Sequence, residues 1–137
     1  VVFFVAQPLV DQQYIQVETF LFHMRRVADH FSGRQVVYVP HPRESGRYIE
    51  IVKAECGFSI QRFSVPIEHA IVLGGEVPRR VASFFSSALV NLAAMLGESM
   101  ELTAFYIPEG DLLKDVEVVE HTYRQMRSTK DNHIKVV

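Results

Sequence analysis

The sequence has little of several features that define large protein classes. It contains a single cysteine, Cys56, which excludes an internal disulfide framework and is compatible with a reducing compartment. With 14 Lys and Arg against 16 Asp and Glu, it lacks the basic excess that is typical of nucleic-acid-binding proteins. No apolar run approaches the roughly 18 residues needed to span a bilayer, and the opening "VVFFVAQPLV" lacks the basic region of a signal peptide. We therefore expect no nucleic-acid partner and no transmembrane segment.

Two kinds of binding motif are also missing. The chain has neither GxGxxG nor GxxxxGK[ST], so dinucleotide and P-loop sites are not expected; "LGGEVP" at 73–78 has two glycines but not their spacing. His23 and His30 lie seven apart on one expected helix without an acidic partner at metal spacing. No carboxylate cluster suited to Mg²⁺ is visible either. We therefore expect no metal site.

Apolar runs alternate with helical periodicity along the 137 residues, which are 48% hydrophobic. Residues 1–6 read as a strand covered on both faces, and apolar residues spaced by three or four from Tyr14 to Phe31 predict an amphipathic helix that ends near Gly33. Further strands are expected at 35–39, 59–63, 80–85 and 102–107, and further helices at 46–56, 66–73, 87–96 and 112–127, the last with Leu113 inward. The tail from Ser128 either frays or returns. The alternation predicts one α/β domain over residues 1–137, with three layers: a mostly parallel sheet of five or six strands and helices on both faces.

Polar residues follow three of the expected strands or open the helices after them. His41 stands between Pro40 and Pro42 at the end of an apolar run, and the fixed φ of each proline lowers the entropy cost of aiming the histidine. Glu68 lies in the first turn after a proline, and the pair Ser86-Ser87 precedes another helix. Parallel strands place all of them on the same rim of the sheet, where ligands of such folds bind.

Each of these residues also has an ordinary structural interpretation. Ser87 can be only a helix N-cap, Glu68 only an acidic residue favourably placed at a helix N-terminus, and Arg43 only a surface residue. Taken together, the free N–H groups and hydroxyls of a helix start, with a histidine and an arginine nearby, form an anion site. An acidic residue beside a phosphate site commonly accepts hydrogen bonds from ribose, so the set predicts a nucleotide.

Three stretches, taken in order, resemble a known family. They are "YVPHPRE" at 38–44, "VPIE" at 65–68 and "FFSSALVNL" at 84–92. They are similar to the motifs of bacterial lipooligosaccharide sialyltransferases and their polysialyltransferase-like relatives, which share an HP motif followed by a Ser-Ser or Ser-Thr motif. The resemblance covers about residues 1–107, and the ordered set is more specific than an HP dipeptide alone.

The resemblance implies a fold, a reaction and a role for each motif residue. The family has the GT-B fold of two Rossmann-like domains, and these motifs belong to its C-terminal, nucleotide-binding half. The implied donor substrate is CMP-sialic acid, with no separate cofactor and no metal, and the implied acceptor is a glycan, from lipooligosaccharide or capsular polysaccharide. His41 would hydrogen-bond or protonate the departing CMP phosphate. Ser86 and Ser87 would hold the phosphate oxygens, and Glu68 would accept from the ribose. Pro42 would aim His41.

The sequence departs from the family at the general base. The family's motif of two acidic residues and a glycine is not found, because "PEGD" at 108–111 has one acid before its glycine and follows His41. Since the chain opens at Val1 within an apolar run, we expect an excised C-terminal half whose N-terminal domain supplies the base, and no turnover by the isolated chain. Arg43 is our own addition, as an electropositive neighbour. The expected location is cytoplasmic or peripheral at the inner membrane.

Two alternatives stay open. The chain can be a non-catalytic doubly wound module that binds a nucleotide, another anion or a partner protein, in which case the same residues are caps and surface groups. It can also be a transferase for a different CMP-activated sugar, because motifs around the phosphate read the nucleotide and not the sugar.

Overall fold

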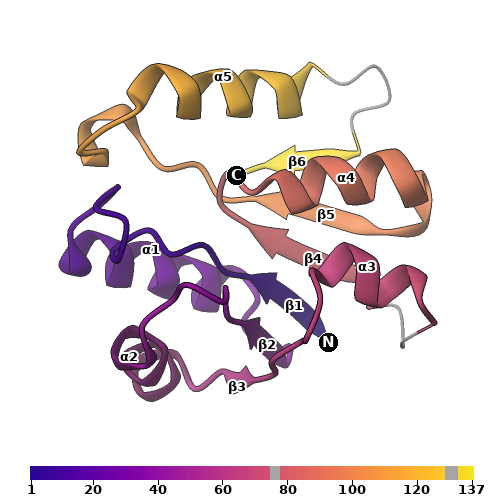
Figure 1. The fold of residues 1–137 in the computed structure, drawn as a ribbon, viewed down its shortest axis with the longest axis horizontal. Helices are drawn as coiled ribbons and strands as arrows, with labels where there is room; N and C mark the ends of the chain where they lie inside the picture. Colours follow the sequence, from indigo (N-terminus) through magenta and orange to yellow (C-terminus); the bar gives the residue numbers. More distant parts are fainter. Residues whose placement is uncertain (75–77, 129–132) are drawn as a thin grey trace.

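Six parallel strands form one sheet in the order β3-β2-β1-β4-β5-β6 in the computed structural model of the chain (Figure 1). The structure describes residues 1–74, 78–128 and 133–137, so the stretch "LGGEVP" at 73–78 lies partly outside the described range. The strands are β1 Val2–Val5, β2 Val36–Val39, β3 Ser59–Ile60, β4 Arg80–Ser83, β5 Glu101–Ala104 and β6 Ile134–Val136. The helices are α1 Val17–His30, α2 Gly46–Cys56, α3 Ile67–Val72, α4 Ser87–Leu96 and α5 Val116–Arg127, with short 3₁₀ turns η1 Gly97–Ser99 and η2 Glu109–Asp111.

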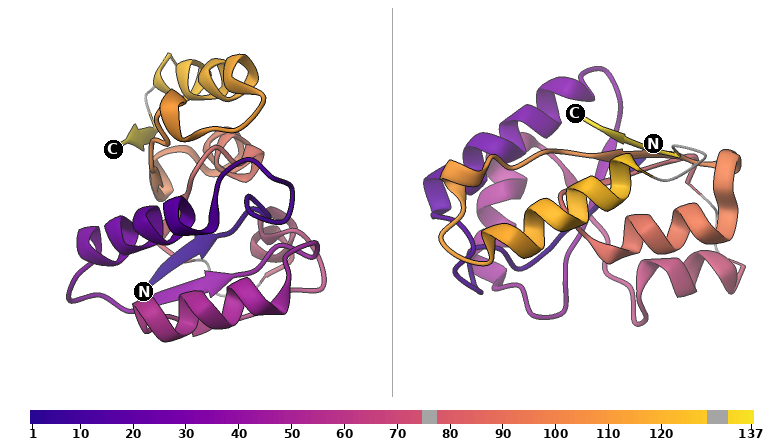
Figure 2. Two further views of the ribbon diagram at one scale, coloured as in Figure 1. Left: turned by 90° about the vertical axis from the view of Figure 1, so that its left-hand side faces the viewer. Right: turned by 90° about the horizontal axis from the view of Figure 1, so that it is seen from above.

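The strand order is that of Rossmann folds, and it confirms the predicted α/β class. From the central strand β1 the chain moves outward through β2 and β3, and then crosses to β4 on the other side of β1. The connections that leave β1 and β4 therefore diverge, which opens a crevice at the carboxyl ends of these two strands. α1 and α2 pack against each other, as do α3 and α4. Seen from above, α1 lies on one side of β5 and β6, and α4 and α5 lie on the other (Figure 2).

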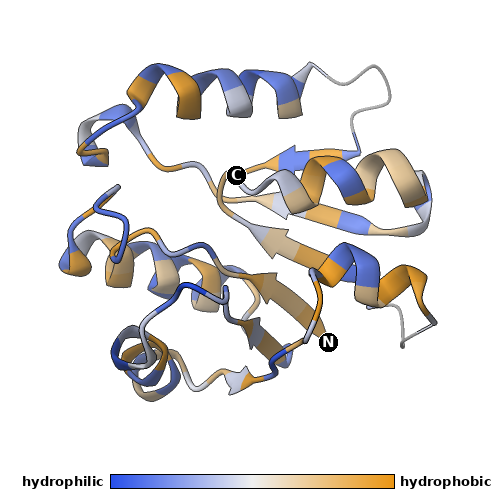
Figure 3. Cartoon of the chain, viewed as in Figure 1, coloured by the Kyte–Doolittle hydropathy of each residue, from blue (hydrophilic) through white to orange (hydrophobic). Residues whose placement is uncertain are grey.

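The core explains why the central strands hold their place. β2 is buried along its whole length, and β1 is hydrophobic throughout (Figure 3), as expected for strands covered on both faces. Phe4 pairs with Tyr38 across β1 and β2, and their rings stack with centroids 5.9 Å apart. Ser83 is fully buried at the same end of the sheet, where its hydroxyl donates to the carbonyl of Val5 at 2.5 Å. This bond joins β4 to β1 beside the crevice.

Local backbone geometry moves two predicted helix starts. The first helix begins at Val17 and not at Tyr14, because Gln13 has a φ of 61° and the amide of Tyr14 bonds to the carbonyl of Leu9. The last helix begins at Val116, so the prediction that Leu113 points inward is wrong. That side chain is 54% exposed.

A buried polar cluster lies apart from the crevice. His23 is 1% exposed; its Nε2 donates to Asp111 Oδ2 at 2.8 Å, and its Nδ1 accepts from Arg26 at 2.8 Å. Burial lowers the pKa of His23, although the hydrogen bond to Asp111 acts to raise it. Arg26 also donates to the carbonyls of Tyr106 and Val137. The sequence did not indicate this acidic partner of His23, because Asp111 is 88 positions away. The cluster joins α1 to the chain after β5 and to the C-terminal end.

Candidate functional site

A cavity of about 730 Å³ lies at the carboxyl ends of β1, β2 and β4. It is lined by all the side chains singled out from the sequence, namely His41, Pro42, Arg43, Glu68, Ser86 and Ser87. Apolar residues such as Phe63, Val65 and Phe85 complete the wall. A largely apolar cavity with a few convergent polar groups is the usual form of a small-molecule site. The structure therefore brings the predicted residues to one place.

The loop after β2 fixes His41 by hydrogen bonds within a few residues. The backbone N–H of His41 donates to Glu44 Oε1, and the backbone N–H of Arg43 donates to His41 Nδ1, both at 3.0 Å. Because a backbone N–H can only donate, Nδ1 must carry a lone pair, so the neutral ring has its proton on Nε2. Desolvation, together with the nearby charge of Arg43, lowers the pKa of His41. The ring therefore offers an Nε2–H donor at the cavity in its neutral form.

Glu44 holds this loop and was not among the sequence candidates. Its Oε2 accepts a hydrogen bond from the hydroxyl of Tyr38, a fully buried residue of β2, while its Oε1 accepts from His41. Burial raises the pKa of Glu44 to about 7, against the two hydrogen bonds, which lower it. A signal was present in the sequence: a tyrosine in an otherwise aliphatic buried strand needs a partner for its hydroxyl, and Glu44 is the next acidic residue.

The start of α4 corrects the expectation that Ser87 is the N-cap. Ser86 has an extended backbone, with φ −77° and ψ 136°, and its hydroxyl accepts from the N–H of Ala88 at 3.1 Å. Ser86 is therefore the cap, and Ser87 is the first helical residue. The Ser87 side chain is exposed and lines the cavity. The capping role thus falls on Ser86, and the Ser87 hydroxyl makes no hydrogen bond within the described residues.

Glu68 is placed by the short helix α3. Pro66 precedes the helix, which begins at Ile67, and Glu68 lies in its first turn as predicted. The adjacent Ile67 is buried, and this anchors the helix to the core. Glu68 is half-buried and lines the cavity.

Gln7 lines the cavity and was not among the residues singled out from the sequence. It follows β1 by two positions, and its Oε1 accepts from the backbone N–H of Phe85 at 3.0 Å. This bond fixes the loop that leads into α4. The sequence did contain a signal for Gln7: it is a polar residue shortly after the central strand, and such positions face the crevice in doubly wound folds.

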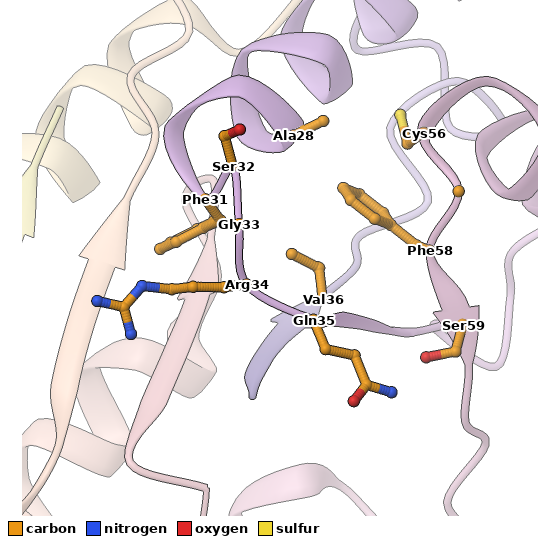
Figure 4. Close-up of a pocket in the computed structure, with 11 residues that line it drawn as sticks. Ala28, Phe31, Ser32, Gly33, Arg34, Gln35, Val36, Cys56, Phe58 and Ser59 are labelled. Atoms are coloured by element: carbon orange, nitrogen blue, oxygen red, sulfur yellow. The ribbon is translucent and has the colours of Figure 1, made fainter.

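A smaller hollow of about 320 Å³ lies near the amino ends of β2 and β3, away from this cavity. Figure 4 shows Cys56 and Phe58 on one side of it and Phe31 on the other. Burial raises the pKa of the Cys56 thiol, and Cys56 packs against the core. The thiol is therefore a packing group with little nucleophilic character.

No group of three or more His, Cys, Asp or Glu side chains that could hold a metal ion occurs within residues 1–74, 78–128 and 133–137. Over the same described ranges, no helix has both the length and the apolar character to cross a membrane. No protein-family model matches the chain, and no curated protein matches it significantly.

Proposed function

We propose that the chain is the nucleotide-binding domain of a metal-independent sialyltransferase, which binds CMP-sialic acid and supports transfer of the sialic acid to a glycan hydroxyl. The observation that carries the proposal is the single cavity that His41, Glu68, Ser86 and Ser87 line together at the carboxyl ends of the strands. These residues come from three separate segments of the chain, and their motifs in this order are the ones that resemble the sialyltransferases. The acceptor glycan and an N-terminal domain that supplies the general base belong to the same proposal.

The chemistry needs a group that stabilises the CMP phosphate as the bond to the sugar breaks. The geometry of the loop supports hydrogen bonding by the neutral ring of His41 through Nε2–H, because Nδ1 is occupied by the Arg43 amide. A phosphate monoester has a second pKa of about 6, so it leaves near neutral pH without full protonation. A positioned hydrogen bond to the developing charge is then the main contribution of His41.

The other residues divide the nucleotide between them. Ser87 binds a phosphate oxygen through its hydroxyl and its backbone N–H at the start of α4, where the helix dipole favours an anion. Ser86 supports it by capping the helix. Glu68 accepts hydrogen bonds from the ribose hydroxyls, and Arg43 adds positive charge at the rim.

The test is a titration of the isotope-labelled chain with CMP, followed by NMR, with Ser87→Ala and Ser86→Ala as variants. We expect shifts near His41, Glu68 and Ser87. Ser87→Ala should weaken CMP binding by about tenfold and leave stability within about 0.5 kcal/mol, since it removes a hydrogen bond to a charged ligand from an exposed position. Ser86→Ala should cost about 1 kcal/mol of stability through the lost cap.

Two outcomes contradict the proposal in different ways. If millimolar CMP shifts no resonance, the nucleotide site is absent. If CMP binds and Ser87→Ala binds it equally well, the phosphate does not lie at α4, and the non-catalytic binding module becomes the better interpretation. Competition by other CMP-activated sugars against CMP-sialic acid distinguishes the remaining alternative, a transferase with a different donor.

A further inference from the structure

The side-chain amide of Gln7 lies at the point where the strand order reverses. β1 ends at Val5, and Gln7 lines the cavity from that strand while the His41 loop lines it from β2 and Ser87 from α4. Among the four residues that follow β1, 6–9, Gln7 is the only one with a polar side chain. Its position is therefore central to any ligand in the crevice.

The orientation of this amide follows from its partner. The backbone N–H of Phe85 can only donate, so the atom 3.0 Å away must be the carbonyl oxygen Oε1 and not the nitrogen. The backbone is held as well, because the carbonyl of Gln7 accepts from Leu9 at 2.8 Å across Pro8. The Nε2 group is left with two N–H donors and has no protein partner in the part of the chain that the structure describes.

We infer that Gln7 is a further ligand-binding residue, whose side-chain N–H groups donate to a phosphate oxygen of the nucleotide. The inference rests on the proposed function. The bond to Phe85, the residue directly before Ser86, holds the amide at the start of α4, where the proposed function places the phosphate. An N–H donor of fixed orientation suits an acceptor-only oxygen, and its bond to a charged oxygen is stronger than one to a sugar hydroxyl.

The decisive variant is Gln7→Glu. A glutamate keeps an oxygen to accept from Phe85 and replaces only the NH₂ donor, by an oxygen that repels phosphate. Gln12→Glu is the matched control, because Gln12 is a half-buried glutamine that lines the same cavity and the substitution adds the same charge. Affinities for CMP and for cytidine, which lacks the phosphate, are measured by calorimetry for the wild-type chain and both variants, with thermal unfolding as the check of folding.

We expect Gln7→Glu to weaken CMP binding by at least about tenfold, to change cytidine binding by less than about twofold, and to exceed the effect of Gln12→Glu. In the wild-type chain, the side-chain amide signal of Gln7 should shift with CMP and not with cytidine, which tests the contact even if the variant fails to fold. Equal losses for CMP and cytidine, equal losses in both variants, or an unmoved amide signal overturn the role of Gln7. If the wild-type chain binds neither compound, the proposed function fails as well, so the two failures are distinguishable.

Discussion

Replacement of Glu44 by Gln should destabilise the chain at low pH and stabilise it at high pH. Glu44 is half-buried between Tyr38 and the His41 loop, and its pKa rises from 4.5 to about 7 in the folded chain. The folded state therefore binds more protons than the unfolded state between these two values. Stability that is fully present below about pH 4.5 is lost as the pH rises, and the loss is complete above about pH 7.

The magnitude follows from the shift. A difference of about 2.5 pKa units is worth about 3 kcal/mol, at about 1.4 kcal/mol per unit. Gln cannot ionise, so Glu44→Gln avoids this loss at high pH. It sacrifices one of the two acceptor oxygens that serve Tyr38 and His41, at a cost of about 1 kcal/mol. We expect the variant to be about 1 kcal/mol less stable than the wild type near pH 4.5 and about 2 kcal/mol more stable near pH 8.

Urea unfolding followed by circular dichroism, at about pH 4.5 and about pH 8, measures both differences. Other charges face Glu44, namely Asp11, which raises its pKa, and Arg62, which lowers it, so the comparison is between variants and not between pH values alone. Glu50→Gln is the control, because Glu50 is exposed on α2. The difference in free energy of unfolding between this variant and the wild type should be the same at both pH values. A difference between Glu44→Gln and the wild type that stays constant with pH would refute the reasoning.

Two further changes test the packing that shapes the site. Tyr123→Phe should lower the free energy of unfolding in urea by about 1–3 kcal/mol, because the buried hydroxyl bonds to two backbone groups after β5 and its loss leaves both without this partner. Tyr48→Phe, on α2, is the control and should cost less than about 0.5 kcal/mol. Gly57→Ala should cost about 1 kcal/mol because Gly57 ends α2 at a φ of 70°, whereas Gly46→Ala, within the same helix, should stabilise by up to about 1 kcal/mol. A loss in Tyr48→Phe as large as in Tyr123→Phe, or equal effects at the two glycines, would contradict these accounts.

Elements that are bounded by local signals could be predicted to the residue. α2 runs from Gly46 to Cys56 as expected, because Ser45 caps its start and Gly57 ends it, and both act within a few positions in the sequence. α4 matches its prediction for the same reason. The fold class followed from the apolar runs, which need no knowledge of distant contacts.

Elements that are ended by distant groups could not. The fourth strand was expected to reach Phe85, but it ends at Ser83, and the N–H of Phe85 turns to Gln7, which is 78 positions away. The fifth strand was expected to reach Ile107, but it ends at Ala104, and the N–H of Ile107 donates to the hydroxyl of Tyr123, which is 16 positions away. A strand pattern does not reveal which side chain from elsewhere will take over an N–H.

The same distinction applies to the site. His41, Glu68 and the two serines could be placed at one rim of the sheet from the sequence, because they follow strands or open helices, and the structure has them lining one cavity. Gln7 and Glu44 were missed because their importance lies in a partner, Phe85 in one case and Tyr38 in the other. Topology identifies which residues reach the rim, and only the hydrogen bonds identify which atoms face a ligand.

These hydrogen bonds also refine the role that the sequence suggested for His41. The sequence allowed a protonated histidine that donates a proton to the leaving phosphate. The Arg43 amide occupies Nδ1, the nitrogen that would have to gain a proton, and desolvation lowers the pKa of the ring further. The proline-bracketed loop thus favours the neutral imidazole and leaves Nε2–H as its one donor at the cavity. On the proposed function, His41 stabilises the phosphate as a hydrogen-bond donor, so binding of CMP should persist at pH values well above the pKa of the ring.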